Sequence, residues 1–135
     1  MNQLRRDAEK LTLLEKIKLA KNPETPLPML KELARDENLK VKVWVAKHKN
    51  SDKDLLETLS KHEDSTVKAV VAGNPKADEV TLSRLAGSSD VIILLNVAKN
   101  KNTPTFVLEK LAVHKNDLLR KTAEESLKNR IPTIK

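Results

Sequence analysis

The sequence contains no cysteine and no tyrosine, and only two of its 135 residues are glycine. Without cysteine, the chain has no disulfides, thiolate metal sites or cysteine nucleophiles, so we expect a reducing, cytoplasmic location. Two glycines, Gly73 and Gly87, cannot build a glycine-rich nucleotide-binding loop. The aromatic residues are Trp44 and Phe106 alone, and this scarcity disfavours a sheet protein, because strands favour aromatic and β-branched residues.

Long apolar runs are also missing. Charged side chains are spread through the N-terminal segment, so we expect no secretory signal there, and no apolar run is long enough to cross a bilayer. We therefore expect no membrane partner. The formal charge is +7, from 26 basic and 19 acidic side chains. This excess favours an acidic partner without naming one.

What the sequence does contain is a 26-residue repeat. Matching columns of small and branched apolar residues recur along the chain without a gap. They are Ala20, Ala46, Ala72 and Ala98; Leu30, Leu56, Leu82 and Leu108; Leu33, Leu59, Leu85 and Leu111; and Val41, Val67, Ile93 and Leu119. We interpret this pattern as about four repeats over residues 20–116.

Each repeat is predicted to hold two short helices. Apolar pairs at i and i+4, such as Val41 and Val45, give the first helix one buried face. Its expected N-caps are Asn38, Asp64 or Ser65, Ser89 or Asp90, and Asn116. The second helix is expected to begin at Thr25-Pro26, Ser51-Asp52, Asp78 or Thr103-Pro104, with Thr as N-cap and Pro at the first helical position.

The two ends depart from the repeat. Residues 1–20 are predicted to form one longer amphipathic capping helix, and residues 117–135 a C-terminal capping helix and tail. Polar outer faces at the ends are what stacked repeats require for solubility. The whole chain is therefore predicted to be one all-α domain, a short α-solenoid.

The segment LAKNPETPLPMLKELARDENLKVKVWVA (residues 19–46) resembles the leucine-rich repeat variant family, which is similar to HEAT and armadillo repeats. The likeness continues in VVAGNPKADEVTLSRLAGSSDVIILLNVA and VAKNKNTPTFVLEKLA, and covers roughly residues 15–125. The resemblance implies a right-handed superhelix in which one helix of each unit can be of 3₁₀ type. It implies no single activity, and the cysteine-bound iron–sulfur cluster of one member has no ligands here.

Residues suited to catalysis or metal binding do not cluster in the sequence. His62 and His114 share a repeat position two units apart, about 20 Å at about 10 Å per helix layer, too far to share a metal ion. His48 replaces the asparagines of its column, which favours a helix-end role. Most Ser and Thr residues are accounted for as helix caps. We therefore expect no enzyme activity, cofactor, metal or small-molecule substrate.

Five lysines form what we call the lysine ridge: Lys21, Lys47 and Lys99 in one column, and Lys49 and Lys101 two positions further on. Lys76 lies close to it. One interpretation is a track for phosphates or an acidic protein surface. The other is that cations favour the negative ends of helix dipoles, by about 0.3–1 kcal/mol each. The sequence leaves both open.

Two apolar features complete the candidate site. Trp44 lies in a column otherwise filled by Lys18, Val70, Asn96 and Thr122, so it is expected to be partly exposed, either as an interface anchor or as a cover over a seam between repeats. The segment 91–95 is apolar all round, with Leu94 where sister repeats have lysine or arginine. We therefore expect Leu94 to expose an apolar patch.

The sequence thus predicts a non-catalytic protein-interaction module that binds through Trp44, Leu94 and the lysine ridge. Its expected partner is a protein with an acidic surface. The alternative is sequence-non-specific binding of a nucleic-acid backbone through the same lysines. Against this alternative stands the shortage of aromatic residues, on which proteins usually stack single-stranded bases.

Overall fold

The computed structural model describes residues 2–131, in which it shows ten α-helices and no strand. The expected all-α class is confirmed. No 3₁₀ helix occurs in this part of the chain, so both helices of every unit are α-helical. The helices are α1 (Gln3–Glu9), α2 (Leu13–Lys21), α3 (Leu27–Leu33), α4 (Leu39–Lys47), α5 (Lys53–Ser60), α6 (Ser65–Gly73), α7 (Glu79–Leu85), α8 (Val91–Lys99), α9 (Thr105–Leu111) and α10 (Asp117–Lys128).

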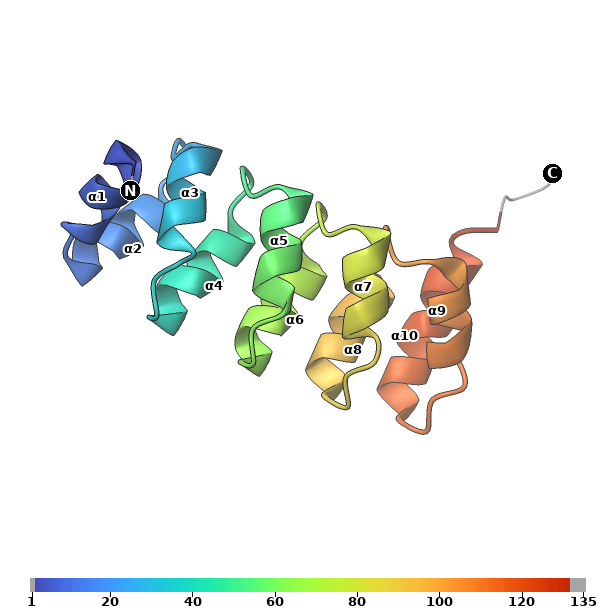
Figure 1. Ribbon diagram of the computed structural model, residues 1–135. Coiled ribbons are helices and arrows are strands. Elements are labelled where there is room, and N and C mark those ends of the chain that lie inside the picture. Colours follow the sequence, from blue (N-terminus) through green and yellow to red (C-terminus); the bar gives the residue numbers. More distant parts are fainter. Residues whose placement is uncertain (1, 132–135) are drawn as a thin grey trace.

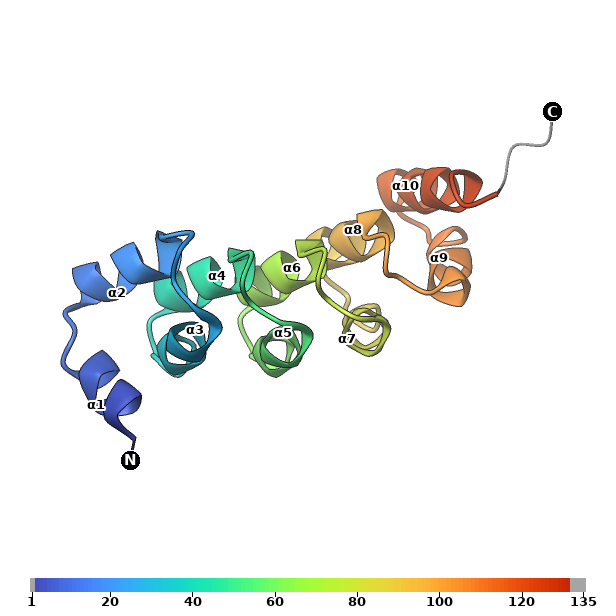
Figure 2. The same cartoon turned by 90° about the horizontal axis from the view of Figure 1, so that it is seen from above.

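The helices form two rows (Figure 1, Figure 2). The even-numbered helices lie side by side in one row and pack directly on one another, while the odd-numbered helices form the other row with looser contacts between neighbours. The even-numbered helices begin at the constant interval of the sequence repeat, from Leu13 to Asp117. The described residues therefore contain five helix pairs, where we expected about four repeats.

The apolar columns of the sequence form the core between the rows. Leu30, Leu56, Leu82 and Leu108, one from each of α3, α5, α7 and α9, are completely buried. The alanine column of the even-numbered helices is buried as well, because small side chains let neighbouring helices approach closely. Its members are Ala20, Ala46, Ala72 and Ala98. Burial of the larger side chains, those of the Leu30, Leu33 and Val41 columns, supplies most of the hydrophobic stabilisation.

The starts of the even-numbered helices follow the expected caps. The side chains of Asn38, Asp64, Asp90 and Asn116 accept hydrogen bonds from backbone N–H groups of the first turn. The starts of α3 and α9 differ from the prediction, because Pro26 and Pro104 occupy the N-cap positions and the helices begin one residue later.

The threonines expected as N-caps instead close the preceding helix. The hydroxyl of Thr25 donates to the carbonyl oxygen of Leu19 over 2.5 Å, and that of Thr103 to the carbonyl of Val97 over 2.6 Å. Ser51 does the same for Val45. Each of these carbonyls also accepts a backbone N–H at the helix end, so the hydroxyl adds a second hydrogen bond to a carbonyl in the last turn.

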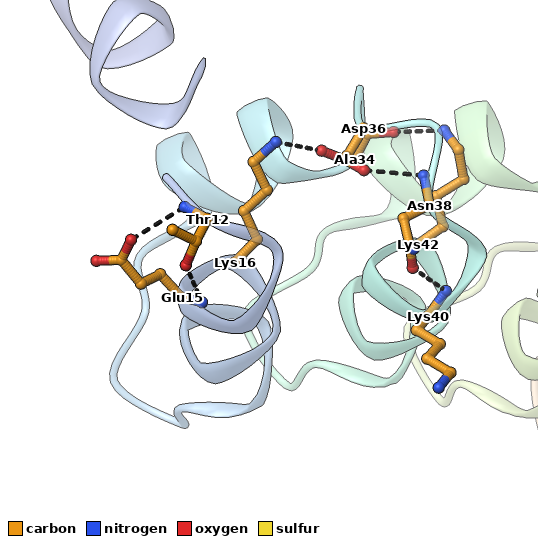
Figure 3. A network of polar contacts seen from close by, with 8 residues as sticks. All are labelled: Thr12, Glu15, Lys16, Ala34, Asp36, Asn38, Lys40 and Lys42. Carbon is orange, nitrogen blue, oxygen red and sulfur yellow. Dashed lines mark hydrogen bonds and ion pairs between the residues drawn. The ribbon is translucent and has the colours of Figure 1, made fainter. Parts of the chain in front are cut away.

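The N-terminal helix predicted over residues 1–20 is two helices. Thr12 interrupts it: its hydroxyl accepts from the backbone N–H of Glu15, and the Glu15 carboxylate accepts from the backbone N–H of Thr12 (Figure 3). This capping box begins a new helix, and α1 lies in the row of odd-numbered helices, where it packs against α3. The bond from the backbone N–H of Thr12 is also the largest cause that holds the pKa of the Glu15 carboxyl below its usual value.

Polar side chains join consecutive units. The side-chain amide of Asn74 donates to the carbonyl of Ala46, that of Asn100 to Ala72, and the hydroxyl of Ser126 to Ala98. Donor and acceptor are separated by the same interval along the chain in all three cases. A hydrogen bond of this kind satisfies a buried carbonyl at a helix end. This role explains why asparagine recurs in the column that contains Asn74 and Asn100.

A partly buried ion pair fixes the first two units (Figure 3). The ammonium of Lys16, on α2, lies 2.5 Å from Asp36, in the turn between α3 and α4, and Asp36 also accepts from the backbone N–H of Asn38. Burial opposes ionisation of Asp36, but these two hydrogen bonds and the charges of Lys16 and Lys42 outweigh it. The pKa of Asp36 is therefore held below its usual value.

Candidate functional site

The lysine ridge lies along the edge where the even-numbered helices end. Lys21, Lys47 and Lys99 are the last residues of α2, α4 and α8, and Lys49 and Lys101 follow in the next turns. These turns follow one another along the upper edge of the molecule in Figure 1. All five side chains are exposed. The structure therefore brings the predicted lysines to one edge.

No carboxylate among the described residues forms an ion pair with these five lysines. The ion pairs present lie elsewhere: Lys16 with Asp36, Arg84 with Glu57, and two pairs within single helices. The positive charge of the ridge is therefore available to a partner. The lysines also lie at helix C-termini, where the negative end of the helix dipole attracts a cation. Both interpretations of the sequence, a track for a partner and helix-end electrostatics, therefore fit this geometry.

Trp44 lies at the ridge. Its indole ring is partly exposed on α4, and the ammonium groups of Lys21 and Lys47 lie 4.9 and 5.0 Å from its centroid. Such distances allow cation–π attraction, worth about 0.5–1 kcal/mol at an exposed site. Trp44 also packs against the core, and it presents a ring face beside two cations, one from α2 and one from its own helix.

Leu94 is not exposed, and its expected role in an apolar patch is wrong. Only 2 % of its surface is accessible, whereas Ile92, two positions earlier, is 61 % exposed. Lysines at the same position in sister repeats suggested a solvent-facing site, but a lysine can bury its aliphatic stem and extend its charge outward. Lys42 is half-buried, and its ammonium donates to the backbone carbonyl of Ala34 over 2.7 Å.

Exposed apolar side chains do occur on the even-numbered helices, in their first turns. Besides Ile92, these side chains are Leu13, Leu14, Leu39 and Leu118. Sequence reasoning missed them. They lie one or two positions before the Val41 column, in helices that recur at the repeat interval, and this register could have indicated their exposure. The exposed face of these helices therefore runs from apolar side chains at one end, past Trp44, to lysines at the other.

A shallow hollow of about 340 Å³ lies between α4 and the start of α6. Leu39, Val43 and Trp44 give it apolar walls. Lys40 and Lys47 contribute cations, and Asp64, the N-cap of α6, contributes one carboxylate. A second hollow, of about 460 Å³, lies over the end of α6 and shares Lys47 with the first. Both hollows open on the face of the even-numbered helices.

The three histidine side chains form hydrogen bonds with backbone groups. Nδ1 of His62 accepts from the backbone N–H of Asp64, and Nδ1 of His114 from that of Asn116, each over 3.0 Å. His48 bonds within its turn and to the preceding unit. No group of three or more metal-ligating side chains occurs in residues 2–131. A further hollow of about 470 Å³, between α1 and α3, carries mixed charges from Arg5, Glu9, Glu32 and other residues, with Lys16 and Asp36 already paired.

Comparisons of this chain with protein-family models, with curated proteins and with solved structures give no match. None of the helices in the described part of the chain is long and apolar enough to cross a membrane.

Proposed function

We propose that this chain is a short right-handed α-solenoid of the leucine-rich repeat variant type, acting in the cytoplasm as a non-catalytic protein-interaction module. The two rows of helices that follow the sequence repeat support the solenoid, and the absence of cysteine supports a reducing compartment. The proposed partner is an acidic segment of another protein that lies across the even-numbered helices.

The observation that carries this proposal is the arrangement at Trp44. A partly exposed indole lies against two ammonium groups, on a ridge of lysines that have no carboxylate partner within the described residues. Tryptophan is enriched among the residues that dominate interface energies, because its ring buries a large rigid surface. Unpaired lysines beside it would attract and orient carboxylates.

The neighbouring apolar side chains favour a protein over a nucleic acid. Leu39 and Val43 line the hollow beside Trp44. A sugar-phosphate backbone gains nothing from aliphatic walls, and Trp44 is the only aromatic side chain there on which a base could stack. An amphipathic acidic segment would use both the apolar part of this face and the lysines.

The proposal is tested by selecting a displayed random peptide library on the purified chain. We expect enriched peptides that combine acidic and apolar residues, and we expect their affinity, measured by fluorescence anisotropy, to fall at least about tenfold in K47E/K99E and in W44A. K61E/K115E is the matched control, because it makes the same charge change on exposed lysines in the turns after α5 and α9, outside the ridge.

The proposal fails if no acidic peptide is enriched, or if K47E/K99E binds such peptides as well as the unaltered chain does. Labelled single-stranded RNA and random duplex DNA are measured in parallel at low and near-physiological salt. Micromolar binding that falls steeply with salt and is lost in K47E/K99E would assign the ridge to nucleic acid instead.

A further inference from the structure

The lysine ridge has a gap at Gly73. Three of the even-numbered helices, α2, α4 and α8, end in Lys21, Lys47 and Lys99, whereas α6, in the middle of the row, ends in Gly73 at the equivalent position. The lysines on either side therefore flank a place where the repeat lacks a side chain.

Neither the backbone nor the packing requires glycine at this position. Gly73 has no positive φ angle, so a residue with a side chain could adopt the same backbone. A Cβ added there would have only the side chain of Asn96 nearby, at 3.7 Å, which is an ordinary van der Waals contact. Glycine in a helix is less favourable than alanine by about 1 kcal/mol. What it contributes here is open space.

That space is the hollow of about 460 Å³ at the end of α6. Ala69, Val70 and Pro75 give it an apolar lining, and Lys47, Lys49 and Lys76 surround it with cations. The ammonium of Lys76 donates to the backbone carbonyl of Lys49 over 2.5 Å, which holds its charge beside the hollow. No carboxylate of the described residues lines it.

We propose that this hollow is the seat for one large apolar side chain of the partner peptide, and that carboxylates flanking that side chain pair with Lys47, Lys49 and Lys76. The apolar lining and the cationic rim are complementary to that chemistry. No aromatic residue lines the hollow, so it offers a nucleic-acid base nothing to stack on. This inference rests on the proposed function and names the place where the partner is anchored.

The decisive variant is G73K, which restores the lysine of the sister helices. If attraction by charge alone determined affinity, an added lysine on the ridge would leave binding equal or make it tighter. If the hollow seats a side chain, the lysine stem fills it. We expect G73K to weaken the selected acidic peptides about tenfold or more, although it raises the net charge by one.

Two further variants complete the experiment. G73A adds a single methyl group, which fills less of the hollow than a lysine stem does, so we expect it to weaken binding less than G73K does. The apolar residues of a selected peptide are also replaced by alanine, one at a time. One of these replacements should weaken binding to the unaltered chain as much as G73K does, and should cause no further loss of affinity when the peptide is measured on G73K. Thermal melts followed by circular dichroism check that each variant folds.

Equal or tighter binding by G73K would overturn this inference. If K47E/K99E still abolished binding in that case, the proposed function would stand and only the seat would be wrong. If no acidic peptide is selected at all, both fail. The absence of any peptide side chain that couples to G73K would also overturn the seat, because affinity would then be spread over the ridge.

Discussion

Nε2 of His48 lies 2.7 Å from the backbone carbonyl oxygen of Asn22, in the preceding repeat unit. Nδ1 of the same ring accepts from the backbone N–H of Asn50 over 3.0 Å. The tautomer with its proton on Nε2 satisfies both bonds. Asn100 makes the same two bonds with its amide, to the carbonyl of Asn74 and from the backbone N–H of Asn102.

Because asparagine performs both roles elsewhere in the column, H48N should be almost neutral, within about 0.5 kcal/mol in the free energy of unfolding. H48A removes both bonds at a buried site and should cost about 1–3 kcal/mol. Urea unfolding followed by circular dichroism measures both. A loss in H48N as large as that in H48A would show that the ring itself, and not its hydrogen bonds, stabilises the chain.

Two buried threonines are expected to respond oppositely to valine. The hydroxyl of Thr81 is completely buried on α7 and makes no hydrogen bond of good geometry among the described residues, while Val107 occupies the same repeat position on α9. The pKa of the nearby Asp78 carboxylate is lowered mainly by the bond from the backbone N–H of Thr81, which valine keeps, and less by the Thr81 hydroxyl, which valine lacks. T81V should therefore stabilise the fold by up to about 1 kcal/mol.

T103V is the matched control, because the Thr103 hydroxyl donates to the carbonyl of Val97. Its loss leaves that carbonyl without the bond and should cost about 1 kcal/mol. The two changes are chemically identical, so thermal melts with opposite shifts would isolate the hydrogen bond. Shifts of the same sign would contradict the assignment.

The pair formed by Asp36 and Lys16 should make stability depend on pH in the acid range. The pKa of Asp36 is lower in the folded chain than its usual value, so the folded state favours the carboxylate. This contribution is fully present above the unfolded pKa, about 3.9, and is lost as pH falls through the lower folded pKa.

D36N should therefore cost about 1–2 kcal/mol at pH 7, since the pair is only partly buried, and the difference from the unaltered chain should shrink below about pH 4. Denaturant unfolding at both pH values checks this, with K16M and the double variant completing a mutant cycle. A D36N penalty that stays constant down to pH 2 would mean that charge plays no part.

Much of the fold could be predicted because the repeat displays its core four times. At Ala20 and its equivalents, only a small residue fits between packed helices, and the recurrence is visible without any structure. The expected N-caps of α4 and α10 were correct, and those of α6 and α8 were among the two candidates given for each, for the same reason: a short side chain with an oxygen at a helix start has one favourable local role.

The errors arose where a residue has two local roles or where burial depends on a neighbour. A threonine before proline can cap the next helix or close the previous one, and Thr25 and Thr103 do the latter. The break at Thr12 could have been found from the Thr12-x-x-Glu15 spacing, which is that of a capping box. Leu94 was misplaced because lysine at its sister positions is only partly solvent-exposed.

In the candidate site, the sequence correctly indicated the line of lysines, since equivalent positions of stacked units fall in a row. It did not reveal the cations over the Trp44 ring, because the Lys21 contact crosses from α2 to α4. Nor did it distinguish Gly73 as a gap, because whether a missing side chain leaves a hollow depends on how far Asn96 and Pro75 reach from other elements.

Trp44 is the only tryptophan and the chain has no tyrosine, so its fluorescence reports the ridge directly. With the ammonium groups of Lys21 and Lys47 at 4.9 and 5.0 Å from the ring centroid, the local potential should be positive. Iodide should therefore quench Trp44 more efficiently than caesium does at low salt, and the difference should fall as added salt screens the lysines over about 10 Å.

In K21E/K47E the preference for iodide should reverse, whereas K61E/K115E should leave it unchanged. Equal quenching by the two ions in the unaltered chain at low salt would show that the lysines do not set the potential at this ring, and would remove the electrostatic basis for an acidic partner there.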